Sequence, residues 1–284
     1  MLTLFRFFVN ILKKEGRMQI RKGRLNEVRF STTDALHKIA TVKESRRPSR
    51  LKVESWALST ARECGVNVPK VLDYFVNPEG QEVLVIERVP RCVPLTRCSP
   101  REQAKHMFDV GRQMTLLNQS ASGYGWINAV TFRGCYETWK EFLLSYVDTF
   151  GLRLSAAQII DQKSVAKVTA IIKGTDLPLN PPYLLHRDLK PTNLLIDEKS
   201  KMWIVDWENT ILGDPLYDLA IVGARGGHNL VWRNLVGGRS LEVDSVRYQL
   251  YEVLALFGFL DFGRRYGQQY KGLRRRLVKL LDAL

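Results

Sequence analysis

Polar residues at fixed distances within one segment, residues 185–218, constrain the fold of this chain more than any other feature. Asp188 and Asn193 lie five residues apart, just before the short apolar run Leu194 to Asp197. This run, the turn-like EKSK and a second run that ends at Asp206 together predict a β-hairpin. Because a hairpin brings its open ends side by side, we expect Asp188, Asn193 and Asp206 to converge.

Two carboxylates and one carboxamide at a single point are a set of oxygen donors. Magnesium prefers oxygen ligands in octahedral geometry and shares them with substrate phosphates. The segment therefore predicts a magnesium and phosphate site, and the alternative is an acidic cluster that arose by coincidence in a phosphate-free fold.

The same segment resembles the catalytic loop of the protein-kinase-like superfamily. HRDLKPTNLLID matches the pattern H-R-D-x-x-x-x-N, and the 18-residue step from Asp188 to Asp206 is also that of the superfamily. VDWE stands where protein kinases have DFG. With the following GDPLYDLA, it resembles the aminoglycoside phosphotransferase family and its choline-kinase and sugar-kinase relatives.

The resemblance implies an α+β, two-lobed, protein-kinase-like fold with an antiparallel-sheet N-lobe and a mainly helical C-lobe. We expect the N-lobe, with its nucleotide-binding sheet and hinge, at residues 18–90. The C-lobe, with the catalytic loop and acceptor pocket, is expected at residues 91–284. Residues 1–17 are left as an N-terminal extension, which is either an interfacial helix or a mis-called start ahead of Met18.

Hydrophobic periodicity agrees with this division. Short strand-like runs, among them Ala35 to Val42 and Glu82 to Arg88, dominate the first third, with one helical pattern from Leu51 to Cys64. Beyond Pro100 the spacing is helical, notably at Arg101–Asn118, Trp139–Thr149 and Ala156–Gly174.

The family's nucleotide-binding elements have counterparts in the expected order. Lys43 competes with Lys38 for the role of the strand lysine. The resemblance implies Gly23 and Asn26 in a shortened phosphate loop, Lys38 and Glu54 as a paired lysine and glutamate, and Glu87 and Val89 at the adenine-binding hinge. The implied cofactors are ATP, with GTP as an alternative, and Mg²⁺.

The resemblance also assigns roles in phosphoryl transfer, where catalysis is positioning plus electrostatic stabilisation. Asp188 would orient the acceptor hydroxyl and take its proton, and Lys190 would neutralise the γ-phosphate. Asn193 and Asp206 would be the metal ligands, and Asp218 would orient the catalytic loop.

The acceptor is expected to be a small molecule. Lys190 and Arg187 are the protein-kinase choices, so a protein Ser/Thr kinase-like enzyme is one alternative. Only 11 residues separate Asp206 from Asp218, however, which leaves no room for the long activation segment that binds peptides. The expected acceptor is a hydroxyl of an aminoglycoside-like antibiotic, sugar, amino sugar or amino alcohol.

The charge distribution motivates an alternative of another class. The formal net charge is +14, and residues 1–53 carry 14 Lys/Arg against 4 Asp/Glu. Such a basic segment can attract nucleotide phosphates, nucleic acid or an anionic membrane, and an equal alternative is a solvated face that keeps the protein soluble. Peripheral membrane contact stays open, although nucleic acid is not the favoured partner. Four cysteines without a CxxC pair disfavour a zinc site or a disulfide scaffold, and a cytoplasmic location is expected.

Overall fold

The computed structural model describes most of the chain outside its N-terminus. The described residues are 20–22, 26–30, 34–40, 49–117, 122–177, 181–226, 229–241, 243, 245–267 and 271–284. The expected N-terminal extension, Gly23 and Lys43 lie outside them.

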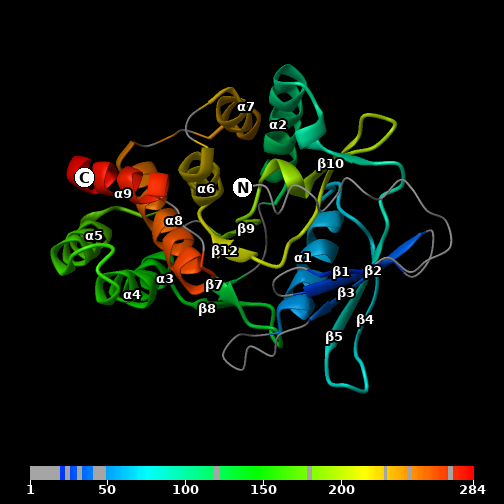
Figure 1. The fold of residues 1–284 in the computed structure, drawn as a ribbon, viewed down its shortest axis with the longest axis horizontal. Coiled ribbons are helices and arrows are strands. Elements are labelled where there is room, and N and C mark those ends of the chain that lie inside the picture. Colours follow the sequence, from blue (N-terminus) through cyan, green and yellow to red (C-terminus); the bar gives the residue numbers. More distant parts are fainter. Residues whose placement is uncertain are drawn as a thin grey trace.

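An antiparallel five-stranded sheet and one helix form the sheet half of the molecule (Figure 1). The strand order is β1-β2-β3-β5-β4, and the central strand β3 pairs with β5 from Ala35↔Glu87 to Ile39↔Val83. Helix α1 contacts β4 and β5, and Leu51, Ala57 and Leu58 of its inner face are buried. These elements are β1 (Ile20–Lys22), β2 (Asn26–Phe30), β3 (Ala35–Ala40), α1 (Arg50–Glu63), β4 (Val71–Val76) and β5 (Glu82–Glu87).

The remaining elements form a mainly helical half. Figure 1 shows α5, α8 and α9 at the end of the molecule away from the sheet half, with β9 and β12 between the two. The helices are α2 (Pro100–Thr115), α3 (Trp139–Tyr146), α4 (Leu152–Ala156), α5 (Gln162–Gly174), α6 (Leu216–Gly226), α7 (Leu230–Arg239), α8 (Ser245–Arg265) and α9 (Lys271–Ala283).

Two small sheets lie within the helical half. The expected hairpin is present and forms the sheet β11-β10-β6, whereas the sheet β8-β7-β12-β9 was not predicted. Its strands are three or four residues long, too short to show a clear alternation in sequence. The strands are β6 (Val93–Pro94), β7 (Tyr124–Ile127), β8 (Gly134–Tyr136), β9 (Tyr183–Leu185), β10 (Leu194–Ile196), β11 (Met202–Ile204) and β12 (Ile211–Gly213).

One helix prediction needs correction. The pattern at 156–174 predicts a single helix, but the structure ends α4 at Ala156 and begins α5 at Gln162. Asp161 causes the restart, because its carboxylate accepts the Ser164 backbone N–H at 2.7 Å and caps α5.

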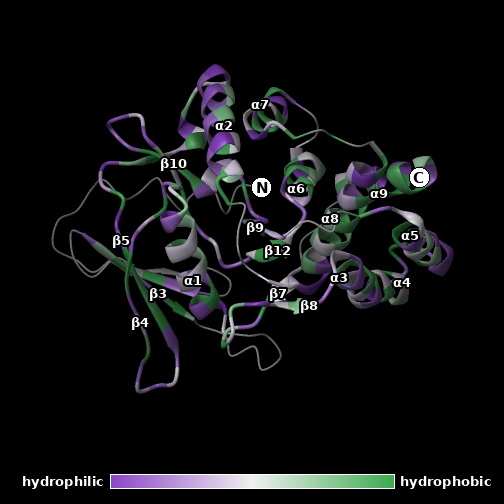
Figure 2. Ribbon diagram, turned by 180° about the vertical axis from the view of Figure 1, so that it is seen from behind, coloured by the Kyte–Doolittle hydropathy of each residue, from purple (hydrophilic) through white to green (hydrophobic). Residues whose placement is uncertain are grey.

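A continuous hydrophobic core runs through both halves. It includes Leu51 of α1, Met107 of α2 and Phe257 of α8. Figure 2 shows hydrophobic residues on β12 and along α8 in the middle of the helical half. Among the described residues, no helix combines the length and apolar character needed to cross a membrane.

Candidate active site

The loop between β9 and β10 is held by a buried carboxylate on α6. Asp218 accepts the backbone N–H of His186 at 3.1 Å and that of Arg187 at 2.7 Å. Arg187 has a left-handed φ of 61°, a conformation that is uncommon for a residue with a Cβ and that these two bonds help to hold. The Arg239 guanidinium lies 3.5 Å from Asp218, and both side chains are only 1% exposed. Asp218 therefore orients the loop backbone, as the sequence predicts.

His186 connects the loop to the hairpin. Its ring is buried, with Nε2 3.0 Å from the carbonyl oxygen of Val205, while Nδ1 accepts the Asp188 backbone N–H at 3.1 Å. Burial lowers the pKa of His186 although nearby carboxylates oppose this, so the ring is neutral near pH 7. His186 supports the loop and does not act as a charged group.

Asp188 is a nearly buried carboxylate enclosed by donors. Its Oδ2 accepts Lys190 Nζ at 2.6 Å and Asn193 Nδ2 at 2.9 Å, and its Oδ1 lies 2.5 Å from Arg225 Nη2. Burial alone would raise the pKa of Asp188, but Arg225 and Lys190 outweigh it and hold the pKa below its usual value. The Asp188 carboxylate is therefore ionised near neutral pH.

The hairpin brings Asp206 beside the loop, as expected. Leu194 pairs with Ile204, and the Val205 backbone N–H donates to the Asn193 carbonyl at 3.0 Å. The Asn193 amide thereby lies 3.4 Å from Asp206 Oδ2. Asp206 has a φ of 70°, which turns the chain sharply after β11. The three residues singled out from sequence therefore converge.

Lys38 of β3 lies at the centre of a carboxylate cluster. Its Nζ is 2.8 Å from Glu54 Oε2 on α1, 2.7 Å from Asp206 Oδ1 and 3.3 Å from Glu208 Oε2. Burial would lower the pKa of Lys38, but the three carboxylates outweigh it and the pKa is raised well above its usual value. Burial would raise the pKa of Asp206, but Lys38 and Lys190 lower it to about 2. Lys38 on β3 therefore pairs with Glu54, and the alternative, Lys43, lies outside the described residues.

Glu208 also belongs to this cluster, although the sequence motifs do not single it out. It accepts a hydrogen bond from the Asn26 side chain, which joins β2 to the same cluster. Its acidic side chain two positions after Asp206 was the available signal.

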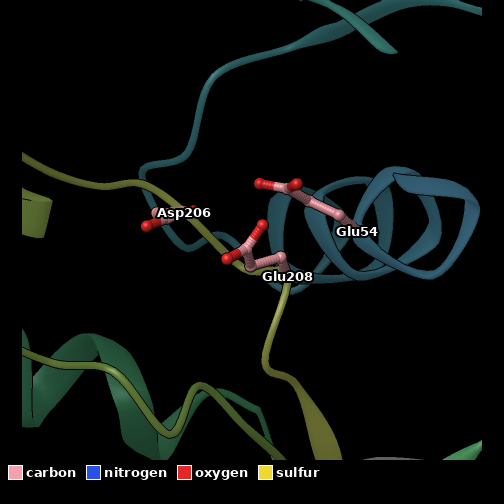
Figure 3. A group of neighbouring side chains, drawn as sticks. All are labelled: Glu54, Asp206 and Glu208. Atoms are coloured by element: carbon pink, nitrogen blue, oxygen red, sulfur yellow. The ribbon is translucent and has the colours of Figure 1, made fainter. Parts of the chain in front are cut away.

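The cluster offers the ligands that a hard cation prefers. Oxygen atoms of Glu54, Asp206 and Glu208 lie within 4.8 Å of one another (Figure 3). All three carboxylates contact Lys38, but the other oxygen of Glu54 also accepts the Trp207 backbone N–H at 3.1 Å, so both Glu54 oxygens have partners in the protein. Asp206 and Glu208, with Asn193 nearby, fit Mg²⁺ by their oxygen chemistry.

The two residues predicted for the hinge, Glu87 and Val89, contact other parts of the chain. Glu87 ends β5, and its carboxylate accepts the Lys70 backbone N–H at 3.1 Å. Val89 is buried against Leu195 and Trp203 of the hairpin. The chain that follows β5 therefore packs on β10 and β11, the hairpin strands flanked by Asn193 and Asp206.

Comparison with known proteins identifies the family. A family model described as "phosphotransferase enzyme family" matches residues 17–257, most of the chain. The chain belongs to this family. As a member it is a phosphotransferase with an alcohol group as acceptor, and the predicted family resemblance is confirmed. No curated protein sequence matches the chain.

Solved structures confirm the kinase-like fold of this phosphotransferase. A thermostable mutant of aminoglycoside phosphotransferase APH(4)-Ia is 17% identical, with 94% of each chain covered and a TM-score of 0.73. A choline/ethanolamine kinase family protein from Mesorhizobium loti is 20% identical over 94% of this chain and 88% of that one, with a TM-score of 0.64. Choline kinase LicA from Streptococcus pneumoniae is 14% identical over 93% and 92%, with a TM-score of 0.63.

Proposed function

We propose that this phosphotransferase moves the γ-phosphate of ATP to a hydroxyl of a small molecule, with Mg²⁺ as cofactor. The observation that carries the proposal is the convergence of Asp188, Asn193 and Asp206 beside the Lys38–Glu54 pair. Structures of APH(4)-Ia, which has a similar fold, contain ADP or AMP-PNP with hygromycin B. GTP stays an alternative donor, since a similar aminoglycoside 2'-phosphotransferase was solved as a GDP complex.

Each residue has a task that follows from its contacts. Asp188 accepts the hydroxyl proton, and its position is set by Lys190 and by the amide of Asn193. Lys38, held by Glu54, would pair with the phosphates of a bound nucleotide, and Asn26 on β2 would lie near them. A bound Mg²⁺ would neutralise phosphate charge, with Asp206 and Asn193 as ligands.

The connection from Asp206 to Asp218 supports a small acceptor. It consists of one turn, the three-residue strand β12 and the start of α6. It contains no long segment of the kind on which protein kinases bind peptides, so the protein-kinase alternative is disfavoured. The basic stretch behind the nucleic-acid or membrane alternative lies mostly outside the described residues.

Removing the base tests the proposal. Asp188→Asn should keep binding of AMP-PNP with Mg²⁺ and lower ATP-dependent transfer at least about a hundredfold, because general-base catalysis contributes about this much. Asp282→Asn, on the exposed surface of α9, is the matched control and should retain both properties. The activity would be measured as ATP consumption across aminoglycosides, sugars and amino alcohols. Retained turnover in Asp188→Asn would refute the role of Asp188.

A further inference from the structure

Arg225, in the last turn of α6, covers one oxygen of the catalytic carboxylate. Its Nη2 lies 2.5 Å from Asp188 Oδ1. The guanidinium is also 4.7 Å from the ring centre of Phe259 on α8. Its side chain is 32% exposed, whereas that of Asp188 is 6% exposed. Arg225 therefore lies between Asp188 and the solvent.

The two oxygens of Asp188 face different parts of the site. Oδ2 binds Lys190 and Asn193, and Asn193 continues to Asp206 on the nucleotide side. Oδ1 faces α6. Because the attacking and leaving oxygens are roughly in line across the phosphoryl group, the acceptor approaches from the side away from the nucleotide. The hydroxyl must then take the position of the Arg225 guanidinium on Oδ1.

When a hydroxyl displaces it from Oδ1, the partly exposed Arg225 guanidinium becomes available to bind another anion. The described parts of α6, α7 and α8 contain three acidic residues, Asp218, Glu252 and Asp261, and each is at most 1% exposed. Each is already paired: Asp218 with Arg239 at 3.5 Å, Glu252 with Arg276 at 2.6 Å and Asp261 with Arg265 at 3.0 Å. The described parts of these helices therefore offer Arg225 no exposed carboxylate. An anionic group on the acceptor would give the guanidinium a partner of opposite charge.

A nearby aromatic cluster is already filled by a cation of the chain itself. The Arg187 guanidinium lies 4.8 Å from the ring centre of Trp126, 5.8 Å from that of Tyr217 and 5.9 Å from that of Tyr146. Ring faces arranged in this way are what binds an ammonium group. With Arg187 in place they are not free for a cationic acceptor.

We propose that Arg225 is an acceptor-binding residue and that the acceptor carries an anionic group, a phosphate or a carboxylate, next to the hydroxyl that is phosphorylated. This inference rests on the proposed function. The acceptor oxygen forms a bond to the γ-phosphorus as the bond from that phosphorus to the β,γ-bridging oxygen breaks. ADP leaves, and the hydroxyl proton passes to Asp188 and then to solvent.

An anion-binding measurement tests the inference without knowledge of the acceptor. The full-length protein is saturated with AMP-PNP and Mg²⁺, which closes the nucleotide phosphate site, and is titrated with inorganic phosphate or with acetate in separate experiments. Unfolding temperature is followed, with KCl at equal ionic strength as reference. We expect saturable stabilisation by at least one anion in the unaltered protein and in the control Arg233→Gln, which is exposed on α7. The anion that stabilises identifies the group.

Arg225→Gln should weaken this anion binding roughly tenfold or more, since a hydrogen bond between charged groups contributes on that scale. Arg225→Lys, which keeps the charge, should retain part of it. The inference would be overturned if the anion stabilised Arg225→Gln as much as the unaltered protein, or if neither anion stabilised the unaltered protein. Failure of AMP-PNP and Mg²⁺ to bind at all would instead refute the proposed function.

A turnover comparison provides a second test. Glucose 6-phosphate, glucose and glucosamine share a ring and differ mainly in charge. We expect kcat/KM for ATP consumption to favour the anionic sugar, and Arg225→Gln to reduce that preference. A preference for glucosamine that persists in Arg225→Gln would contradict the inference.

Discussion

The buried pair of Asp218 and Arg239 allows stability and catalysis to be separated by mutation. In Asp218→Ala, the backbone N–H groups of His186 and Arg187 lose their acceptor, and Arg239 loses its ion-pair partner. Burial already lowers the pKa of Arg239, although Asp218 opposes that shift. The substitution therefore leaves a strongly desolvated guanidinium in the core.

The expected cost follows from this burial. Removing one partner of a buried ion pair destabilises a protein by about 3–5 kcal/mol. For a chain of this size, this corresponds to a fall in unfolding temperature on the order of 10 °C. Transfer activity should also fall, because Asp188 follows directly after the two backbone groups that Asp218 holds.

The assay is a double-mutant cycle of Asp218→Ala and Arg239→Met by urea denaturation, with ATP consumption measured on each variant. The double variant should be more stable than the sum of the single effects predicts by about 2 kcal/mol, because the unpaired cation is gone. Its activity should stay as low as that of Asp218→Ala, since the loop N–H groups still lack their acceptor. Additive stability effects, or recovery of activity in the double variant, would refute this reasoning.

Three further predictions concern the carboxylate cluster and the helix packing. Burial raises the pKa of Glu54 to about 7 although Lys38 opposes this, so Glu54 becomes protonated below that pH and its pair with Lys38 weakens. Activity should therefore fall as the pH drops through 7, and Glu54→Gln should remove this fall from the pH profile of activity. Asp206 has a pKa of about 2 and stays ionised in this range, so Asp206→Asn should weaken Mg²⁺-dependent AMP-PNP binding by a factor that is the same at each pH, measured by calorimetry. In Gly238→Ala the new Cβ would lie 2.0 Å from the Phe108 carbonyl oxygen and force α7 away from α2, which should cost about 1–3 kcal/mol or more in urea denaturation.

The helical and strand pattern of the chain was largely predictable. Expected elements such as Leu51–Cys64 and Glu82–Arg88 appear within a residue or two as α1 and β5. Apolar spacing is a local signal, so a segment long enough to show a period reveals its own structure. The strands of the β8-β7-β12-β9 sheet are too short for such a signal and form only where tertiary packing aligns them.

The sequence by itself determined the centre of the site. Asp188, Asn193 and Asp206 lie on two ends of one hairpin, and pairing of β10 with β11 brings those ends together. Hairpin register is set by residues close in sequence, so the spacing alone was sufficient to predict the convergence.

Only the tertiary structure decided what surrounds this centre. Glu208 joins Asn26 and Lys38 from a distant sheet, and Arg225 reaches Asp188 from the end of α6. These contacts depend on how the sheet half and the helices pack against the hairpin. No local period or spacing encodes that packing, because it is set by the fit of side chains far apart along the chain.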